Sequence, residues 1–99
     1  MRELTGKQRR HLRALGQRLA ATVQVGHDGV TETLVAQVAA QLDAAELVKV
    51  RVGDNAPEDR HDTAEALARR THAHLAQVLG RTILLYRARK DAPEIVLPS

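Results

Sequence analysis

The chain has 99 residues, which is enough for one modest core, so we expect a single domain over residues 1–99. Its hydrophobic fraction of 43% is almost entirely aliphatic, with one Tyr and no Phe or Trp, and the absence of Cys excludes disulfides and thiolate metal sites. No apolar run approaches the roughly 20 residues of a membrane span, and the N-terminus does not resemble a secretory signal, so we expect a cytoplasmic protein.

The formal net charge of +3 is unevenly distributed along the chain. Residues 1–27 hold six Lys or Arg and one Glu (+5), residues 28–65 hold three cations and nine carboxylates (−6), and residues 66–99 hold six cations and two carboxylates (+4). Basic ends around an acidic middle predict one basic and one acidic surface, and a basic surface attracts polyanions such as nucleic acid.

The first predicted element is an amphipathic helix over residues 4–20, with Thr5 as its N-cap. Leu12, Leu15 and Leu19 recur at helical spacing and form an apolar stripe. Five cations occupy the rest of its circumference: Lys7, Arg9, Arg10, Arg13 and Arg18.

The next elements are a short β-branched strand at 22–25, a tight turn at 26–29 and a second helix over 31–43. Thr31 is its predicted N-cap, and Glu32 lies in its first turn.

A strand at 47–52 follows, because Val48, Val50 and Val52 alternate with Lys49 and Arg51. The two cations share one strand face, which should therefore be open or at an edge of the sheet.

A third helix is predicted to begin with Pro57 at its first position and to run to about residue 71. Two apolar runs at 74–79 and 82–87 flank Gly80-Arg81 and predict a hairpin. The tail over 88–99 should be irregular. The order α-β-α-β-α-β-β predicts an α/β domain, an α+β two-layer arrangement with a small mixed four-stranded sheet.

The segment Gly26-His27-Asp28-Gly29 is the most informative motif. It links a strand to a helix whose N-terminal N–H groups favour phosphate, so G-x-x-G at this place can cradle a phosphodiester backbone, as in KH domains. A plain strand-to-helix turn is the alternative, because two glycines three residues apart are common.

Four blocks lie in order along the chain, at residues 4–13, 25–32, 46–50 and 80–87. Together they resemble the CRM (chloroplast RNA splicing and ribosome maturation) domain family, in particular its bacterial stand-alone YhbY-like members. The resemblance spans about residues 4–87. It implies a fold related to the C-terminal domain of a bacterial initiation factor, RNA binding through the G-x-x-G loop and nearby basic surface, and association with precursors of the large ribosomal subunit.

One residue departs from the family pattern, which commonly has Lys, Ser or Asn between the glycines. Asp28 would repel phosphate if it faced the ligand, and His27 offsets this only when protonated. We expect Asp28 to point away as a turn-forming residue. The full set of expected RNA-contacting residues is Gly26, His27, Asp28, Gly29, Thr31, Lys7, Arg10, Arg13, Arg81 and Arg87.

The basic helix face contributes to this site only if the first helix packs beside the first strand. Tyr86 could stack on a base or belong to the core. The five histidines show no metal or catalytic spacing, so we expect no enzyme activity, metal, cofactor or small-molecule substrate, and a monomer.

Two functional alternatives remain beside binding of ribosomal RNA. One is a protein-interaction adaptor on the ribosome, and the other is a small hydrolase, for which the sequence offers no convergent acid/base set. The adaptor would use the acidic middle of the chain, with Asp54, Glu58, Asp59, Asp62 and Glu65.

Overall fold

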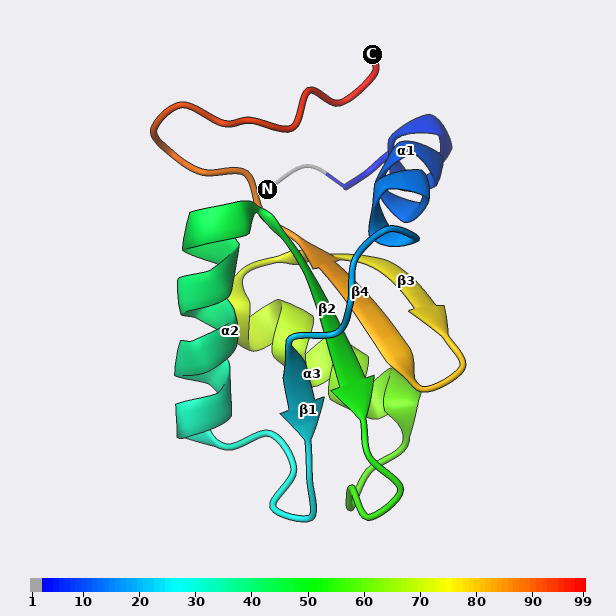
Figure 1. Ribbon diagram of the computed structural model, residues 1–99, viewed down its shortest axis with the longest axis vertical. Helices are drawn as coiled ribbons and strands as arrows, with labels where there is room; N and C mark the ends of the chain where they lie inside the picture. The colour runs from blue at the N-terminus through cyan, green and yellow to red at the C-terminus, as the bar shows by residue number, and fades with distance from the viewer. Residues whose placement is uncertain (1–2) are drawn as a thin grey trace.

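The computed structural model describes residues 3–99, which fold into three helices and a four-stranded mixed sheet (Figure 1). The α/β class and the element order predicted from the sequence are confirmed. The elements are α1 (Gly6–Gly16), β1 (Val23–Val25), α2 (Glu32–Ala45), β2 (Leu47–Val52), α3 (Arg60–Thr71), β3 (His74–Leu79) and β4 (Thr82–Tyr86).

The strands lie in the order β1-β2-β4-β3, so the β3–β4 hairpin pairs with β2 through β4. β1 runs parallel to β2, which requires the crossover that α2 provides, and the other pairs are antiparallel. The predicted hairpin is confirmed, with Gly80 at φ 56° in its turn. β2 is an interior strand, so the expected sheet edge at Lys49 and Arg51 is wrong. Lys49 pairs with Leu84 on the face that α1 partly covers and is half-buried, while Arg51 is exposed.

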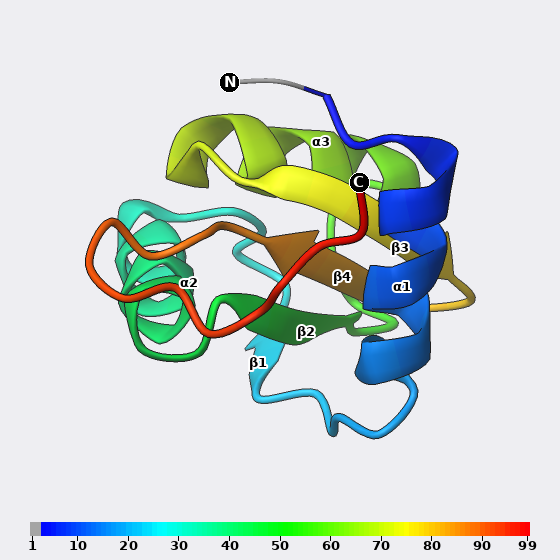
Figure 2. The same cartoon turned by 90° about the horizontal axis from the view of Figure 1, so that it is seen from above.

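Both faces of the sheet bury apolar side chains, because successive residues of a strand point to opposite faces. On one face α2 and α3 cover the larger core, in which Ile83 and Leu85 of β4 are buried. On the other face α1 covers the alternate residues Leu84 and Tyr86 (Figure 2). The second core is smaller and consists of Leu4, Leu12, Leu47, Ala76, Leu84 and Tyr86, with Ile95 and Leu97 packed against it.

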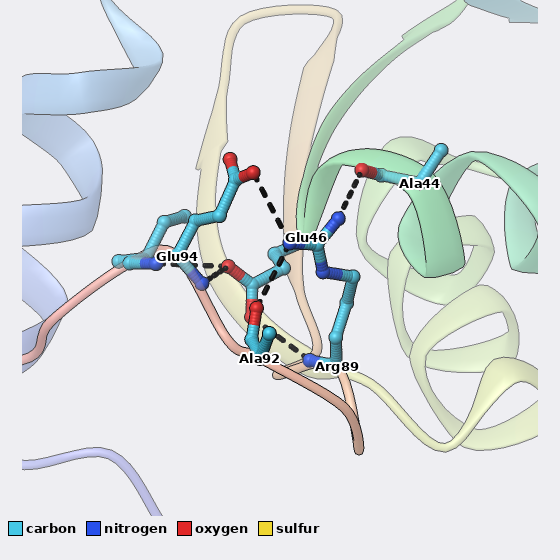
Figure 3. Close-up of polar contacts among 6 residues, drawn as sticks. Ala44, Glu46, Arg89, Ala92 and Glu94 are labelled. Atoms are coloured by element: carbon cyan, nitrogen blue, oxygen red, sulfur yellow. Dashed lines mark hydrogen bonds and ion pairs between the residues drawn. The ribbon is translucent and has the colours of Figure 1, made fainter.

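The tail after β4 has no helix or strand, as expected, yet it is tied to the second face through Glu46. Glu46 ends α2 with φ 68° and is only 1% exposed. Its carboxylate accepts the backbone N–H groups of Arg89, Glu94 and Ile95, each at 2.8 Å (Figure 3). Burial on its own would raise the pKa of Glu46, but these three N–H groups and the Arg89 charge outweigh it and hold the pKa below its ordinary value.

The first helix is shorter than predicted, because it ends at Gly16 and not near residue 20. Thr5 is its N-cap as predicted, and Gln8 completes a capping box with it. Gly16 is buried against β4, and a Cβ at this position would lie 2.7 Å from Cδ2 of Leu84. The glycine therefore allows the end of α1 to approach the sheet.

The predicted start of the third helix is also wrong. Asp59 is the N-cap, and its side chain accepts the N–H groups of His61 and Asp62 at 2.8 and 2.9 Å. Pro57 consequently precedes the helix, in the loop between β2 and α3. The competing N-cap signal of Asp59 outweighs the preference of proline for the first helical position.

Candidate nucleic-acid interface

The G-x-x-G segment forms a tight turn between β1 and α2, at the lower end of the molecule in Figure 1. The N–H of Gly29 donates to the carbonyl of Gly26 at 3.0 Å, and Gly29 has φ 70°, a conformation that favours glycine. A Cβ on Gly29 would lie 3.0 Å from Cγ of Pro57, whereas a Cβ on Gly26 would meet no atom within 4 Å. The two glycines therefore differ: Gly29 is required by the backbone, and Gly26 keeps the loop surface open.

The N-terminus of α2 follows this turn directly. Thr31 is its N-cap, as predicted, and its side chain accepts the N–H of Leu34 at 3.1 Å. Within residues 3–99, the N–H groups of Glu32 and Thr33 have no hydrogen-bond acceptor. Donors of this kind at the positive end of a helix favour an anion.

The two residues between the glycines lie at the tip of the turn. The side chains of His27 and Asp28 are 76% and 75% exposed, and Nε2 of His27 lies 3.2 Å from Oδ1 of Asp28. When His27 is protonated the pair is neutral, and when it is not, the pair has a net negative charge. The turn therefore supplies backbone donors to a ligand without a net positive side-chain charge of its own.

The loop between β2 and α3 packs against this turn. The N–H of Gly53 donates to the carbonyl of Val25 at 2.9 Å, and Pro57 faces Gly29. The exposed carboxylates of this loop belong to the acidic middle of the chain, which therefore lies beside the G-x-x-G turn. They are Asp54, Glu58 and Asp59. Arg81, an expected RNA-contacting residue, reaches the same end of the sheet, where Nη1 lies 3.2 Å from Oδ1 of Asp54.

The first helix does not pack beside the first strand, which was the condition for its cations to join the G-x-x-G site. α1 packs on β2, β3 and β4, on the face opposite α2 and α3, and lies at the other end of the molecule from the 26–29 turn (Figure 1). Lys7 and Arg10 are exposed there, and Arg13 is half-buried. The structure thus separates these cations from the G-x-x-G turn.

Arg87 has extensive contacts inside the protein. Its guanidinium donates to the carbonyl of Thr71 at 2.5 Å, to that of Ala39 at 3.0 Å and to Oδ1 of Asp43 at 2.6 Å. These bonds join the end of α3 to α2, and the side chain is 23% exposed. Because the contacts give Arg87 a structural role, we leave it out of the proposed RNA surface.

Tyr86 belongs to the core and is 4% exposed. Its ring stacks on His74, with centroids 6.1 Å apart and an interplanar angle of 22°. Burial, and then the charge of Glu46, raises the pKa of Tyr86, while burial lowers the pKa of His74. The ring is therefore not placed to stack on a base.

The sequence interpretation missed two charged residues. Glu46 gives no signal because a carboxylate at the end of a helix ordinarily lies in water, and its partners follow it in the chain by 43 to 49 residues. The other is Arg70 of α3, whose Nη1 donates to the carbonyl of Val30, directly after the G-x-x-G turn, at 3.0 Å. No periodicity links residues 40 positions apart.

Two further observations concern other classes of protein. No helix within residues 3–99 is long and apolar enough to cross a membrane. In the same part of the chain, His, Asp and Glu side chains form no group of three that could hold a metal ion.

A small mixed sheet with a glycine turn entering a helix N-terminus is typical of a class of RNA-binding α/β domains. The sequence-family model of the CRS1/YhbY (CRM) domain matches residues 4–87. The chain belongs to this family.

Relatives support this assignment over nearly the whole chain. The chain is 44% identical over 95 residues to Probable RNA-binding protein YqeI of Bacillus subtilis, covering 96% of this chain and 99% of the relative. It is 34% identical over 98 residues to an RNA-binding protein of Haemophilus influenzae, covering 99% and 98%. The chain is also similar to the solution structure of SAV1595 from Staphylococcus aureus, whose description names RNA binding. The two structures superimpose with a TM-score of 0.82 at 40% sequence identity, and the match covers 96% of this chain and 99% of SAV1595.

Proposed function

We propose that this protein binds ribosomal RNA in precursors of the large ribosomal subunit and acts in ribosome assembly as a cytoplasmic binding protein rather than an enzyme. The main structural support is the turn from Gly26 to Gly29, which leads directly into α2. The start of α2 presents the N–H groups of Glu32 and Thr33 at an exposed end of the molecule. Family membership and the names of the relatives support RNA as the ligand.

The proposed RNA surface has two separate parts. The first is the end formed by the G-x-x-G turn, Thr31 and Arg81, which contacts phosphates through backbone donors and a cation. The second is the face of α1 with Lys7, Arg10 and Arg13. Few side chains at either part can read base edges, so recognition rests on the RNA backbone and on RNA shape.

Binding to a fragment of large-subunit ribosomal RNA across a salt series tests this proposal. Gly26→Asp puts a carboxylate into open space at the turn, and Gly26→Asn is its uncharged control of the same size. We expect the wild type to bind with a steep salt dependence, Gly26→Asp to weaken binding about tenfold or more, and Gly26→Asn to remain near wild type. Equal binding by both variants would remove the turn from the RNA site.

The role in assembly requires a separate measurement. Sedimentation of cell extract should place the protein with large-subunit precursors, and RNase treatment should release it. The acidic loop beside the turn favours an adaptor that contacts basic ribosomal proteins as the second candidate. Recruitment that survives RNase and high salt would support the adaptor and contradict the proposed RNA contact.

A further inference from the structure

The end of the molecule that presents the G-x-x-G turn is unfavourable for phosphate as judged by its side chains alone. Asp28 and Glu32 are exposed in the turn and the first helical position, and Glu58 and Asp59 are exposed in the adjoining loop. The basic residues of this end are Arg60, which is exposed, and Arg81, which is paired with a carboxylate, so carboxylates outnumber cations. Backbone N–H groups would therefore hold a phosphate against local repulsion unless another cation lies near them.

Arg70 of α3 is a cation that lies beside the start of α2. Its Nη1 donates to the carbonyl of Val30, the residue between the turn and the Thr31 N-cap, at 3.0 Å. Within residues 3–99, no other basic side chain from a separate element hydrogen-bonds to residues 26–32, and no carboxylate lies within ion-pair distance of Arg70.

The backbone beneath Arg70 is held in place. Arg87 bonds to the carbonyl of Thr71, the last residue of α3, and to that of Ala39 in α2. These bonds fix the last turn of α3 against α2, which begins at the turn. A guanidinium has five N–H donors, and one of them is used on Val30, so the exposed head retains donors in a geometry that suits phosphate oxygens.

We propose that Arg70 is a second phosphate-binding cation of the G-x-x-G site beside Arg81, supplied by α3 in place of a basic residue within the turn. The RNA backbone phosphate lies between the N–H groups at the start of α2 and the Arg70 guanidinium. This inference rests on the proposed function and assigns a residue of that site.

The neighbouring residue provides a matched control. Arg69 is exposed on the same helix and has the same charge, but successive helical residues differ in direction by about 100°, so Arg69 points away from Arg70. Arg70→Gln and Arg69→Gln therefore remove equal charge from adjacent positions, and Arg70→Lys keeps the charge without the planar donor set.

The experiment measures binding of the full chain to the ribosomal RNA fragment by fluorescence anisotropy across a salt series, with folding checked by circular dichroism. We expect Arg70→Gln to weaken binding about tenfold at low salt and to reduce the salt slope by about 0.7 to 0.9, one phosphate contact. Arg69→Gln should change affinity less than threefold, and Arg70→Lys should fall between the wild type and Arg70→Gln. In a Gly26→Asp background, Arg70→Gln should have little further effect, because both changes act on one site.

The outcomes separate this inference from the proposed function. If the wild type binds, Gly26→Asp weakens binding and Arg70→Gln matches Arg69→Gln, the inference about Arg70 is wrong and the turn remains an RNA site. If folded wild type does not bind RNA, the proposed function fails and the inference fails with it.

Discussion

The carboxylate of Glu46 accepts the backbone N–H of Ile95 at 2.8 Å, across 49 positions of the chain. It is buried, and the N–H groups of Arg89 and Glu94 complete its hydrogen bonding (Figure 3). A charge in this environment is stabilising only because its partners are present.

We therefore expect Glu46→Ala to lower the free energy of unfolding by about 2–4 kcal/mol, because three backbone donors lose a charged acceptor. Urea denaturation followed by circular dichroism measures this. Glu94→Gln is the control: its side chain is 75% exposed, and its ion pair with Arg89 should contribute less than about 1 kcal/mol. If Glu46→Ala lowers the free energy of unfolding as little as the control does, the tail is not held by this carboxylate.

The pH dependence of stability follows from the same residue. The pKa of Glu46 is lowered in the folded protein from an ordinary value of 4.5, so the folded state binds fewer protons than the unfolded chain. Its stabilising contribution is complete above pH 4.5 and is lost as the pH falls through the folded-state pKa. As the pH falls below 4.5, the free energy of unfolding of the wild type should decrease more steeply than that of Glu46→Gln. Parallel curves for the two proteins would contradict the assignment.

Gly16 should resist replacement even though alanine is the better helix former. Gly16→Ala places a Cβ 2.7 Å from Leu84, which is 2% exposed and has little space to move, so we expect a loss of about 1–2 kcal/mol. Gly6→Ala in the same helix meets only Nη1 of Arg10, at 3.6 Å, and should be neutral or stabilising. Thermal unfolding of both variants tests the contrast, and equal shifts would mean that α1 does not approach β4 this closely.

The two glycines of the turn should also differ in their contribution to stability. Gly29→Ala forces a side chain into φ 70° and against Pro57, which should cost about 1–2 kcal/mol, whereas Gly26→Ala should cost less than about 0.5 kcal/mol. Chemical denaturation of the two single variants makes the comparison. A larger cost at Gly26 would overturn the geometry described for the turn.

Asp28→Asn should leave RNA affinity within about threefold of the wild type, because its carboxylate is 75% exposed and lies beside His27. The binding measurement is the salt series described for Gly26→Asp. A gain beyond tenfold would show that Asp28 faces the phosphates.

The sequence was sufficient for the strands and for the start of α2, because their signals are local. The alternation around Val50 and the N-cap at Thr31 each act within a few residues, and both are confirmed. The first helix was extended too far because Leu19 continues the apolar spacing, while the contact that ends the helix at Gly16 comes from β4.

The site could be anticipated only where it is continuous in the chain. The G-x-x-G turn is such a segment, and its place between a strand and a helix is as predicted. The position of α1 depends on which sheet face has room for Leu12, and sequence periodicity does not contain this information. The contact between Arg70 and Val30 similarly depends on how α3 crosses α2.

The placement of α1 away from the G-x-x-G turn has a consequence for the kind of RNA that could use both parts. Under the proposed function the two parts are linked binding modules, and their combined affinity depends on whether one RNA spans both. A short single strand that reaches only one part gains no avidity from the other. A folded RNA whose separate strands approach the protein from two sides would gain affinity from both parts, and the protein would then select the three-dimensional shape of the RNA without reading any base.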